Sequence, residues 1–459
     1  MSAKKKIHFE ISERKVLLRV FDVASVMLTL YLVGIVFNFN YFIIDDDNFY
    51  WTFLLAIYLL LFGSVFEMYN LQIASNEYAI IKSIVLTVST TVLLYLLTPV
   101  LTPSLPSNRI QIVYFFLAIM ISLLIWRVFY AKYIASHRFE KRVLLVCDSE
   151  MVRELIENLT AIDPHYKVIG VLNSGENNGW KEINVKLHEV EGFVLNHKVS
   201  EVVVASQDTE KVTLELYDKL LLLLENGYTI REYTQVYENM TKRIPLQYVA
   251  QDFYRYFPFS RSNQNRLYLA VTRVMDIMVS LIGVMIGILF IPLLLICNAI
   301  GNKGKLFYTQ ERVGKNGKNF RIIKFRTMVK NAEANGAVFA QTNDNRITPF
   351  GKFLRKSRID EFPQFFNILL GEMSVIGPRP ERPVFVKQIA EQMPFYQTRH
   401  IIKPGLTGWA QVNYSYGDSI EDSLMKLQYD LYYIKHRSIF LDINIVIKTL
   451  STVLFYRGQ

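Results

Sequence analysis

Two adjacent acidic residues, Asp360 and Glu361, lie among basic side chains in the C-terminal third of this 459-residue sequence. The basic residues before and after them include Lys324, Arg326, Arg355, Arg358 and Arg379. Arginine presents a planar fork that pairs bidentately with phosphate, and a carboxylate can bind Mg²⁺ or attack phosphorus. These residue types together predict a site for a diphosphate substrate with a metal ion.

The sequence around the acidic pair predicts a helix from about Asp360 to Leu370. Pro363 is tolerated in the first turn of a helix, and Gly371 is a suitable C-terminal stop. Both carboxylates would then lie at the helix N-terminus, where partial positive charge keeps them ionised and a phosphate can approach. An acidic pair at a helix start is also a common cap, so the basic neighbours decide the interpretation.

Rigid residues surround one of those basic neighbours, because Pro378 and Pro380 bracket Arg379 and restrict its backbone. The spacing of the cations alone leaves an alternative open, namely a solvated basic face against anionic lipid. A nucleic-acid interface is less favoured, since the segment adjoins membrane-active sequence and carries no nucleic-acid-binding motif. We therefore expect no nucleic-acid partner.

The composition places these residues in a membrane-associated chain, because 51% of the residues are hydrophobic and the formal net charge is +10. Such a charge suits an anionic membrane surface or a phosphorylated substrate. Cys147 and Cys297 form neither a disulfide framework nor a zinc-binding spacing, which is typical of a reducing compartment. The length predicts three units, namely residues 1–138, 139–250 and, after a linker at 251–264, residues 265–459.

The first third contains four apolar segments, each near the roughly 20 residues that a spanning helix needs. They are Leu17–Phe37, Trp51–Tyr69, Ile80–Leu97 and Ile110–Phe129. Lysines and arginines flank the first and last segments, whereas the first loop carries Asp45, Asp46 and Asp47 and no basic residue. The positive-inside rule predicts a four-helix transmembrane bundle with both ends in the cytoplasm. Met1–Glu10 is basic but lacks a cleavage site, so we expect it to be retained.

The middle region predicts a Rossmann-like α/β domain in the cytoplasm. Short apolar runs, Val143–Val146, Val168–Leu172 and Val202–Ala205, alternate with helix-like stretches, as in a parallel sheet. The turn after the first run, residues 147–150, contains no glycine, so the usual dinucleotide phosphate cradle is absent. A structural or regulatory role is favoured over nucleotide binding.

A further apolar stretch, Leu269–Ile300, is interrupted by Pro292, which kinks a helix. Basic residues flank it on both sides, whereas a spanning helix should show charge asymmetry. We therefore expect a re-entrant membrane helix that enters and leaves on the cytoplasmic face, with a fifth span as the alternative. A late segment, Ile439–Phe455, mixes apolar and polar residues and predicts a helix at the membrane interface.

These motifs closely resemble the bacterial sugar transferase family, the monotopic polyprenyl-phosphate phosphoglycosyl transferases, over roughly Leu269 to Tyr456. Four elements occur in the family's order: Gln310–Gly314, Lys324–Met328, the acidic pair and Gly377–Pro380. The preceding spans and α/β domain are similar to the large, hexose-transferring branch, which includes undecaprenyl-phosphate glucose and galactose phosphotransferases. The resemblance implies an α-rich monotopic catalytic domain at the cytoplasmic face of the bacterial inner membrane.

The resemblance also implies the role of each site residue. Asp360 would attack the sugar-linked phosphate of a UDP-hexose and expel UMP, and Glu361 would hold Mg²⁺. Lys324, Arg355 and Arg379 would bind the nucleotide diphosphate, and undecaprenyl phosphate would then attack the aspartyl intermediate. Relatives often carry Ser before the helix-breaking proline, where this chain has Ile291. Homodimers are common in this branch, and the product would feed capsule, exopolysaccharide or O-antigen synthesis.

Three other functions also agree with the sequence. The chain could be a membrane scaffold of polysaccharide assembly, a hydrolase that releases sugar phosphate to water, or a sensor whose α/β domain binds a ligand. The intact acidic pair with Lys324 and Arg379 argues against a scaffold. No residue selects the donor sugar, although parts of Asn331–Asn345 and Gln411–Asp418 are candidates for its pocket.

Overall fold

A computed structural model describes most of the chain and divides it into two compact units. The described residues are 11–37, 39–44, 48–69, 74, 77–98, 101–134, 141–147, 152–162, 166–173, 184–205, 213–246, 263, 265–302, 304–329, 332, 344–393, 395–414 and 419–454. The first unit comprises residues 1–202 and 212–230, and the second comprises residues 203–211 and 231–459. The acidic loop at 45–47, the turn at 148–150 and nearly all of the linker at 251–264 lie outside the described residues.

The first unit begins with four apolar helices at the positions that the sequence predicts. They are α1 (Ile11–Phe37), α2 (Phe49–Val65), α4 (Glu77–Leu96) and α5 (Ile110–Phe129), which continues into a π-helical turn at Tyr130–Ile134. By length and composition, Lys15–Phe37 and Ile110–Tyr133 can each cross a membrane, whereas the apolar parts of α2 and α4 are shorter. That all four helices cross the bilayer, with both ends in the cytoplasm, stays a prediction.

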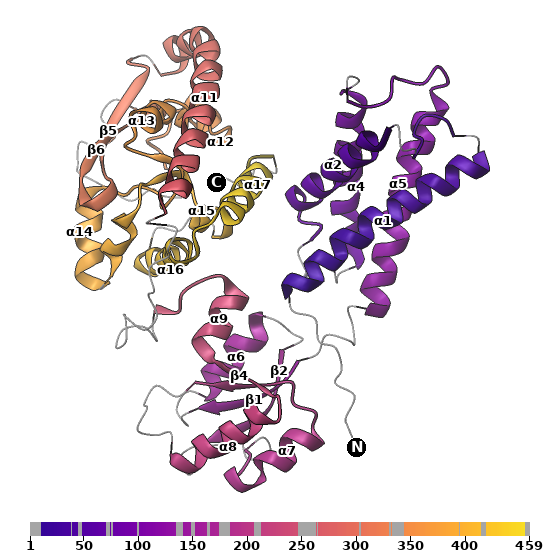
Figure 1. Cartoon of the computed structure of the whole chain (residues 1–459). Helices are drawn as coiled ribbons and strands as arrows, with labels where there is room; N and C mark the ends of the chain where they lie inside the picture. The colour runs from indigo at the N-terminus through magenta and orange to yellow at the C-terminus, as the bar shows by residue number, and fades with distance from the viewer. Residues whose placement is uncertain are drawn as a thin grey trace. The chain divides into compact units, whose positions relative to one another are not determined.

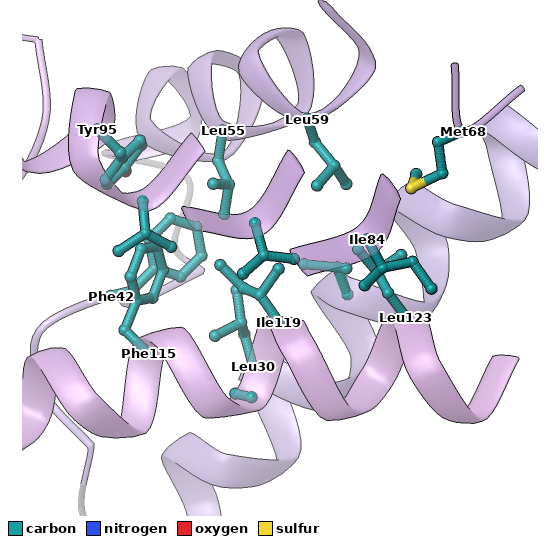
Figure 2. Packing of buried hydrophobic residues seen from close by; sticks show 14 of the residues in the cluster. Leu30, Phe42, Leu55, Leu59, Met68, Ile84, Tyr95, Phe115, Ile119 and Leu123 are labelled. Atoms are coloured by element: carbon teal, nitrogen blue, oxygen red, sulfur yellow. The ribbon is translucent and has the colours of Figure 1, made fainter. Parts of the chain in front are cut away.

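The four helices pack around one apolar cluster that includes Leu55, Ile84 and Phe115, each with no exposed surface (Figure 2). One ion pair is buried beside it, because Arg127 of α5 donates a hydrogen bond of 2.6 Å to Asp22 of α1. A charged pair away from water needs this direct contact, since removing either partner leaves an uncompensated charge. The pair therefore fixes α1 against α5.

A four-stranded sheet in the order β2-β1-β3-β4 follows, and its first two strands are parallel. Its elements are β1 (Lys141–Cys147), α6 (Val152–Ile162), β2 (Tyr166–Asn173), a 3₁₀ turn (Leu187–Glu189), α7 (Val190–Asn196), β3 (Glu201–Val204), α8 (Leu214–Glu225) and β4 (Thr229–Glu232). Helices α7 and α8 lie on one face and α6 on the other (Figure 1), as right-handed crossovers require for this strand order. The predicted α/β alternation is confirmed, and β4 is an addition to the predicted strands.

The second unit combines helices with two small two-stranded sheets. It contains α9 (Tyr233–Thr241), α11 (Arg266–Gly301), β5 (Phe307–Val313), β6 (Asn319–Phe325), α12 (Pro349–Lys356), α13 (Gln364–Leu370), β7 (Ser374–Ile376), α14 (Pro383–Gln392), β8 (Gly405–Thr407), α15 (Trp409–Asn413), α16 (Ile420–His436) and α17 (Ile439–Leu454). Among the described residues, 3₁₀ segments occur at Lys315–Gly317, Ile359–Glu361 and Tyr396–Ile401. Strands β5 and β6 form an antiparallel hairpin, and β7 pairs with β8 in parallel.

Helix α11 is 36 residues long, contains Pro292, and is long and apolar enough to cross a membrane. Asn265 caps its N-terminus by accepting hydrogen bonds from two backbone N–H groups. Proline removes one hydrogen bond from the helix, yet the helix continues to Gly301. Whether α11 re-enters the cytoplasmic face or spans the bilayer is not decided by these features, so the re-entrant geometry stays a prediction.

Helix α9 directly follows β4, yet its Glu238 pairs with Lys435 and His436 of α16, and the residues after it pack into the core of the second unit. Ile244 and Leu246 belong to the same apolar cluster as Ile376, Trp409 and Leu431. The Trp409 indole donates a hydrogen bond of 3.0 Å to the carbonyl oxygen of Lys242. The segment 233–246 is therefore part of the second unit, in which α17 also packs through Ile445.

Candidate active site

The acidic pair lies in a 3₁₀ turn, Ile359–Glu361, and not at the start of an α-helix. The predicted helix from Asp360 is wrong in its first residues, because α13 begins at Gln364 with Pro363 as its N-cap. Arg358 adopts a left-handed conformation (φ 59°) that turns the chain after α12. The predicted stop is confirmed, since Gly371 ends α13 with φ 85°, a conformation that favours glycine. Basic side chains, and not the end of an α-helix, therefore surround the carboxylates.

Contacts between α13 and α11 hold this turn in place. Arg273 of α11 donates hydrogen bonds of 2.6 and 2.7 Å to the carbonyl oxygens of Ile368 and Leu369 at the end of α13. Any side chain at Gly283 of α11 would collide with the ring of Phe365, because an added Cβ would lie 2.4 Å from it. A cation at the negative end of a helix is stabilising, so α11 seats α13 and the turn before it.

Three cations bind the carboxylate of Glu361. Arg379 and Lys324 lie 2.8 and 3.4 Å from Oε1, and Arg358 lies 3.6 Å from Oε2. Burial opposes ionisation of Glu361, but the charges of Arg379, Lys324 and Arg358 outweigh it and hold its pKa below the usual value. Glu361 is therefore a fixed negative charge that orients its basic neighbours.

The carboxylate of Asp360 has a different environment, although it is equally buried at 8% exposure. Burial and the adjacent charge of Glu361 raise the pKa of Asp360 to about 6, against the opposing charges of Lys324, Arg355 and Arg379. No described residue donates a hydrogen bond to this carboxylate, in contrast to Glu361. Asp360 is thus ionised at neutral pH and more basic than a solvated aspartate.

The β5–β6 hairpin and α12 supply two of the cations. Lys324 lies near the end of β6 opposite Tyr308, and burial lowers its pKa. Arg355, in the last turn of α12, donates a hydrogen bond of 3.0 Å from Nε to the hydroxyl of Thr327. Burial also lowers the pKa of Arg355. Thr327 was not predicted as a site residue, although it lies inside the Lys324–Met328 motif.

A loop packed backbone to backbone presents Arg379. The Gly377 N–H donates to the Thr407 carbonyl and the Gly405 N–H donates to the Pro378 carbonyl, each at 2.9 Å. An added Cβ at Gly377 would lie 2.4 Å from the Lys403 carbonyl oxygen, so glycine is required for this approach. The Gly377–Pro380 motif and the segment Lys403–Trp409, which are distant in the sequence, therefore form one structural element around β7 and β8.

Arg326 lies apart from the acidic pair. Its guanidinium donates to the Asn302 carbonyl oxygen at 3.1 Å, just after α11, and packs against Gly304. The structure thus brings Lys324, Arg358 and Arg379 onto Glu361 and places Arg355 where its charge acts on Asp360. These four cations face two carboxylates, which leaves an excess of two positive charges. That excess suits a diphosphate, which carries two or more negative charges.

The donor chemistry of the acidic pair fits Mg²⁺, which is usually held by one or two carboxylates together with substrate phosphates and water. Among the described residues, no group of three or more His, Cys, Asp and Glu side chains gathers at one point. Glu361 already contacts Lys324 and Arg379, so a metal there would take the place of these contacts. The candidate sugar-pocket segments lie partly outside the described residues, at 333–343 and 415–418.

Comparison with known proteins places this site in a family. The model of the bacterial sugar transferase family matches residues 267–456. The chain is 48% identical over 141 residues to a putative undecaprenyl-phosphate N-acetylgalactosaminyl 1-phosphate transferase of Bacillus subtilis, a match that covers 31% of this chain and 79% of the relative. The protein therefore belongs to the bacterial sugar transferase family, and its apolar helices agree with membrane association.

Two longer relatives are named for the transfer of different sugars. The UDP-N-acetylgalactosamine-undecaprenyl-phosphate N-acetylgalactosaminephosphotransferase of Aeromonas hydrophila is 42% identical over 223 residues, which are 48% of this chain and 51% of the relative. The UDP-glucose:undecaprenyl-phosphate glucose-1-phosphate transferase of Xanthomonas campestris is 38% identical over 202 residues, which are 43% of this chain and 40% of the relative. The chain thus matches about half of the first relative's length and 40% of the second's, and the names of the two relatives differ in the sugar transferred.

Proposed function

We propose that this protein transfers hexose-1-phosphate from a UDP-hexose to undecaprenyl phosphate and releases UMP. The observation that carries the proposal is the difference between the two adjacent carboxylates. Glu361 is bound by three cations, whereas Asp360 has a raised pKa and no hydrogen-bond donor among the described residues. A carboxylate that is ionised, shielded from water and not engaged by a donor is suited to attack phosphorus.

The reaction proceeds in two displacements at phosphorus. In the first, an oxygen of Asp360 attacks the sugar-linked phosphate, the bond to the bridging oxygen breaks, and UMP leaves with that oxygen and its electron pair. In the second, a phosphate oxygen of undecaprenyl phosphate attacks the phosphosugar on Asp360, and the carboxylate leaves. The product is a sugar-diphosphate lipid, and Asp360 is regenerated.

The surrounding cations bind and orient the diphosphate during both displacements. Lys324, Arg355, Arg358 and Arg379 offset the negative charge that approaches Asp360, which would otherwise repel its attack. Arg326, whose guanidinium binds the Asn302 carbonyl oxygen away from the acidic pair, stays a predicted contact of the diphosphate. Mg²⁺, held by Glu361 and the phosphates, would supply further charge neutralisation on the diphosphate oxygens.

The membrane places the lipid acceptor within reach of the site. Helices α1, α5 and α11 are long and apolar enough to cross a bilayer, which supports attachment to the bacterial inner membrane with the catalytic unit on the cytoplasmic face. A homodimer and a role at the start of capsule, exopolysaccharide or O-antigen synthesis belong to the same proposal. The alternative is a scaffold or sensor that keeps the fold without the chemistry.

The decisive experiment replaces the proposed nucleophile by its amide, Asp360→Asn. Wild type and variant in detergent would be given UDP-glucose, UDP-galactose or UDP-N-acetylgalactosamine with Mg²⁺ and undecaprenyl phosphate. UMP release and lipid product would be measured, and labelled phosphosugar bound to the protein would be sought without acceptor. We expect the wild type to yield all three and the variant none, because an amide is a poor nucleophile.

A matched control is Glu157→Gln, which removes a carboxylate from a solvent-exposed pair with Arg153 and should leave transfer unchanged. Release of UMP by Asp360→Asn at the wild-type rate would exclude Asp360 as the nucleophile. Wild-type protein that releases sugar phosphate without any lipid acceptor would indicate a hydrolase. A wild type that is inactive with every donor would favour the scaffold or sensor.

A further inference from the structure

A buried ion pair lies directly behind the loop that presents Arg379. Arg399, in the 3₁₀ segment Tyr396–Ile401, is 5% exposed, and Asp430 of α16 is 1% exposed. The guanidinium of Arg399 donates to Asp430 at 2.7 Å and to the Tyr396 hydroxyl at 2.6 Å. The Nη2 atom of Arg399, which donates to Asp430, also donates to the main-chain carbonyl oxygen of Arg379 at 3.0 Å.

This arrangement requires an arginine. The three acceptors are a carboxylate, a hydroxyl and a carbonyl on three separate segments, and the rigid fork of a guanidinium reaches all of them. A lysine offers a single ammonium group on a flexible chain and cannot reproduce this geometry. Burial alone is weak evidence that an ion pair stabilises a fold, because desolvation offsets the attraction between its charges.

The position of the pair gives it a more specific consequence. Backbone hydrogen bonds fix the Arg379 loop at Gly377 and Pro378, and Arg399 adds a third anchor at the carbonyl of Arg379 itself. On the opposite side, the Arg379 guanidinium reaches Glu361 at 2.8 Å. Arg399 therefore fixes the main chain from which a site cation projects, without bonding either carboxylate of the acidic pair.

We propose that Arg399, held by Asp430, is a positioning residue that sets the direction of Arg379 toward the diphosphate of the donor. This inference rests on the proposed transferase function and adds to it a residue outside the four sequence motifs around the acidic pair. It predicts that changes at Arg399 act on the site through Arg379, and so alter donor binding and the ionisation of Asp360.

The test compares Arg399→Lys with wild type in transfer kinetics at several pH values. With Arg379 displaced, the KM for the UDP-sugar should rise about tenfold or more, the size expected for a misplaced charged contact. The acidic limb of the pH profile should also move upward, because Arg379 is one of the charges that oppose the raised pKa of Asp360. Loss of stability alone would lower the amount of active enzyme, but it would change neither the KM for the UDP-sugar nor the position of the acidic limb.

Glu238→Gln is the matched control, because Glu238 forms ion pairs with Lys435 and His436 in the same unit and contacts neither Arg379 nor the acidic pair. It should leave KM and the pH profile unchanged. Asp430→Asn, which retains the side-chain volume, is the second variant if Arg399→Lys does not fold. It should also raise the KM for the UDP-sugar and move the acidic limb of the pH profile upward.

Folded variants with wild-type KM and pH profile, or an equal shift in Glu238→Gln, would overturn the positioning role. These outcomes are distinct from failure of the proposed function, in which the wild type itself releases no UMP from any donor. A readout independent of turnover is UDP binding in the Asp360→Asn background, where adding Arg399→Lys should weaken affinity about tenfold.

Discussion

The α/β sheet and the 3₁₀ turn Ile359–Glu361 both bury carboxylates, but the charges around these carboxylates differ. Glu201 at the start of β3 is 3% exposed and is bonded to Lys141 at 3.1 Å and to the Tyr166 hydroxyl. Its charge is balanced by one lysine. At the turn, two carboxylates face four cations, and Asp360 has no hydrogen-bond donor among the described residues.

The two regions differ in whether the charges around the buried carboxylates are balanced. A balanced pair such as Lys141–Glu201 holds two strands together and leaves nothing for a ligand. An excess of positive charge around a basic carboxylate is costly in the free protein and is relieved by an anionic substrate.

The largest effect is expected from Glu361→Gln. The amide cannot balance Arg379, Lys324 and Arg358, so the cations lose their orientation and transfer should fall by about 100-fold or more. The comparable change in the sheet, Glu201→Gln, should leave transfer unchanged and cost about 1–3 kcal/mol of stability. The two variants would be compared by their transfer rates and thermal unfolding midpoints, measured in the same detergent. Equal losses of transfer in the two variants would contradict the distinction.

A smaller effect, on stability alone, is expected from Leu144→Ala. Leu144 in β1 has no exposed surface, so its truncation should destabilise the α/β sheet by about 2–5 kcal/mol. Hydrogen exchange should increase in β1 and β2, while protection of α13 and the transfer rate stay as in wild type. Loss of transfer in a protein whose second unit keeps its protection would show that the sheet contributes to catalysis.

The smallest effect concerns the ionisation of Asp360, whose pKa is raised to about 6. Transfer needs the ionised form, so its rate should rise with pH through about 6. A carboxyl with a raised folded-state pKa contributes stability that is fully present below its unfolded pKa and is lost as pH rises through about 6. Asp360→Asn should therefore be more stable than wild type at pH 8, by about 1–3 kcal/mol. An unchanged or lower thermal midpoint would contradict this account.

Local sequence patterns predicted much of the framework. Apolar length located α1, α2, α4 and α5, alternation located β1 to β3, and Gly371 ended α13 as expected. These features depend on interactions within a few residues of the chain, such as hydrophobic periodicity and the conformational freedom of glycine. The β5–β6 hairpin was not predicted, because most side chains along β5 are exposed or half-buried and show no apolar alternation.

The sequence predicted which residues gather near the acidic pair better than it predicted how they are arranged in space. Lys324, Arg358 and Arg379 converge on Glu361, a partner that the sequence did not predict for them, whereas Arg326 turns to Asn302. Spacing along the chain cannot distinguish Arg326 from Lys324, since both belong to one motif at the end of β6. The direction of each side chain depends on contacts with distant segments.

Residue types and local patterns predicted a membrane-associated chain, a parallel α/β sheet and an acidic pair among basic residues. They could do so because residue type sets charge and hydrophobicity, and short-range spacing sets secondary structure. Long-range packing is needed to explain why Asp360 and Glu361 lie in a 3₁₀ turn and why Arg399 anchors Arg379. It also explains why the cations bind Glu361, while no described residue donates a hydrogen bond to Asp360. These outcomes depend on long-range packing of α11, α13 and the β7–β8 loops, because burial and through-space charge set the ionisation of a carboxylate.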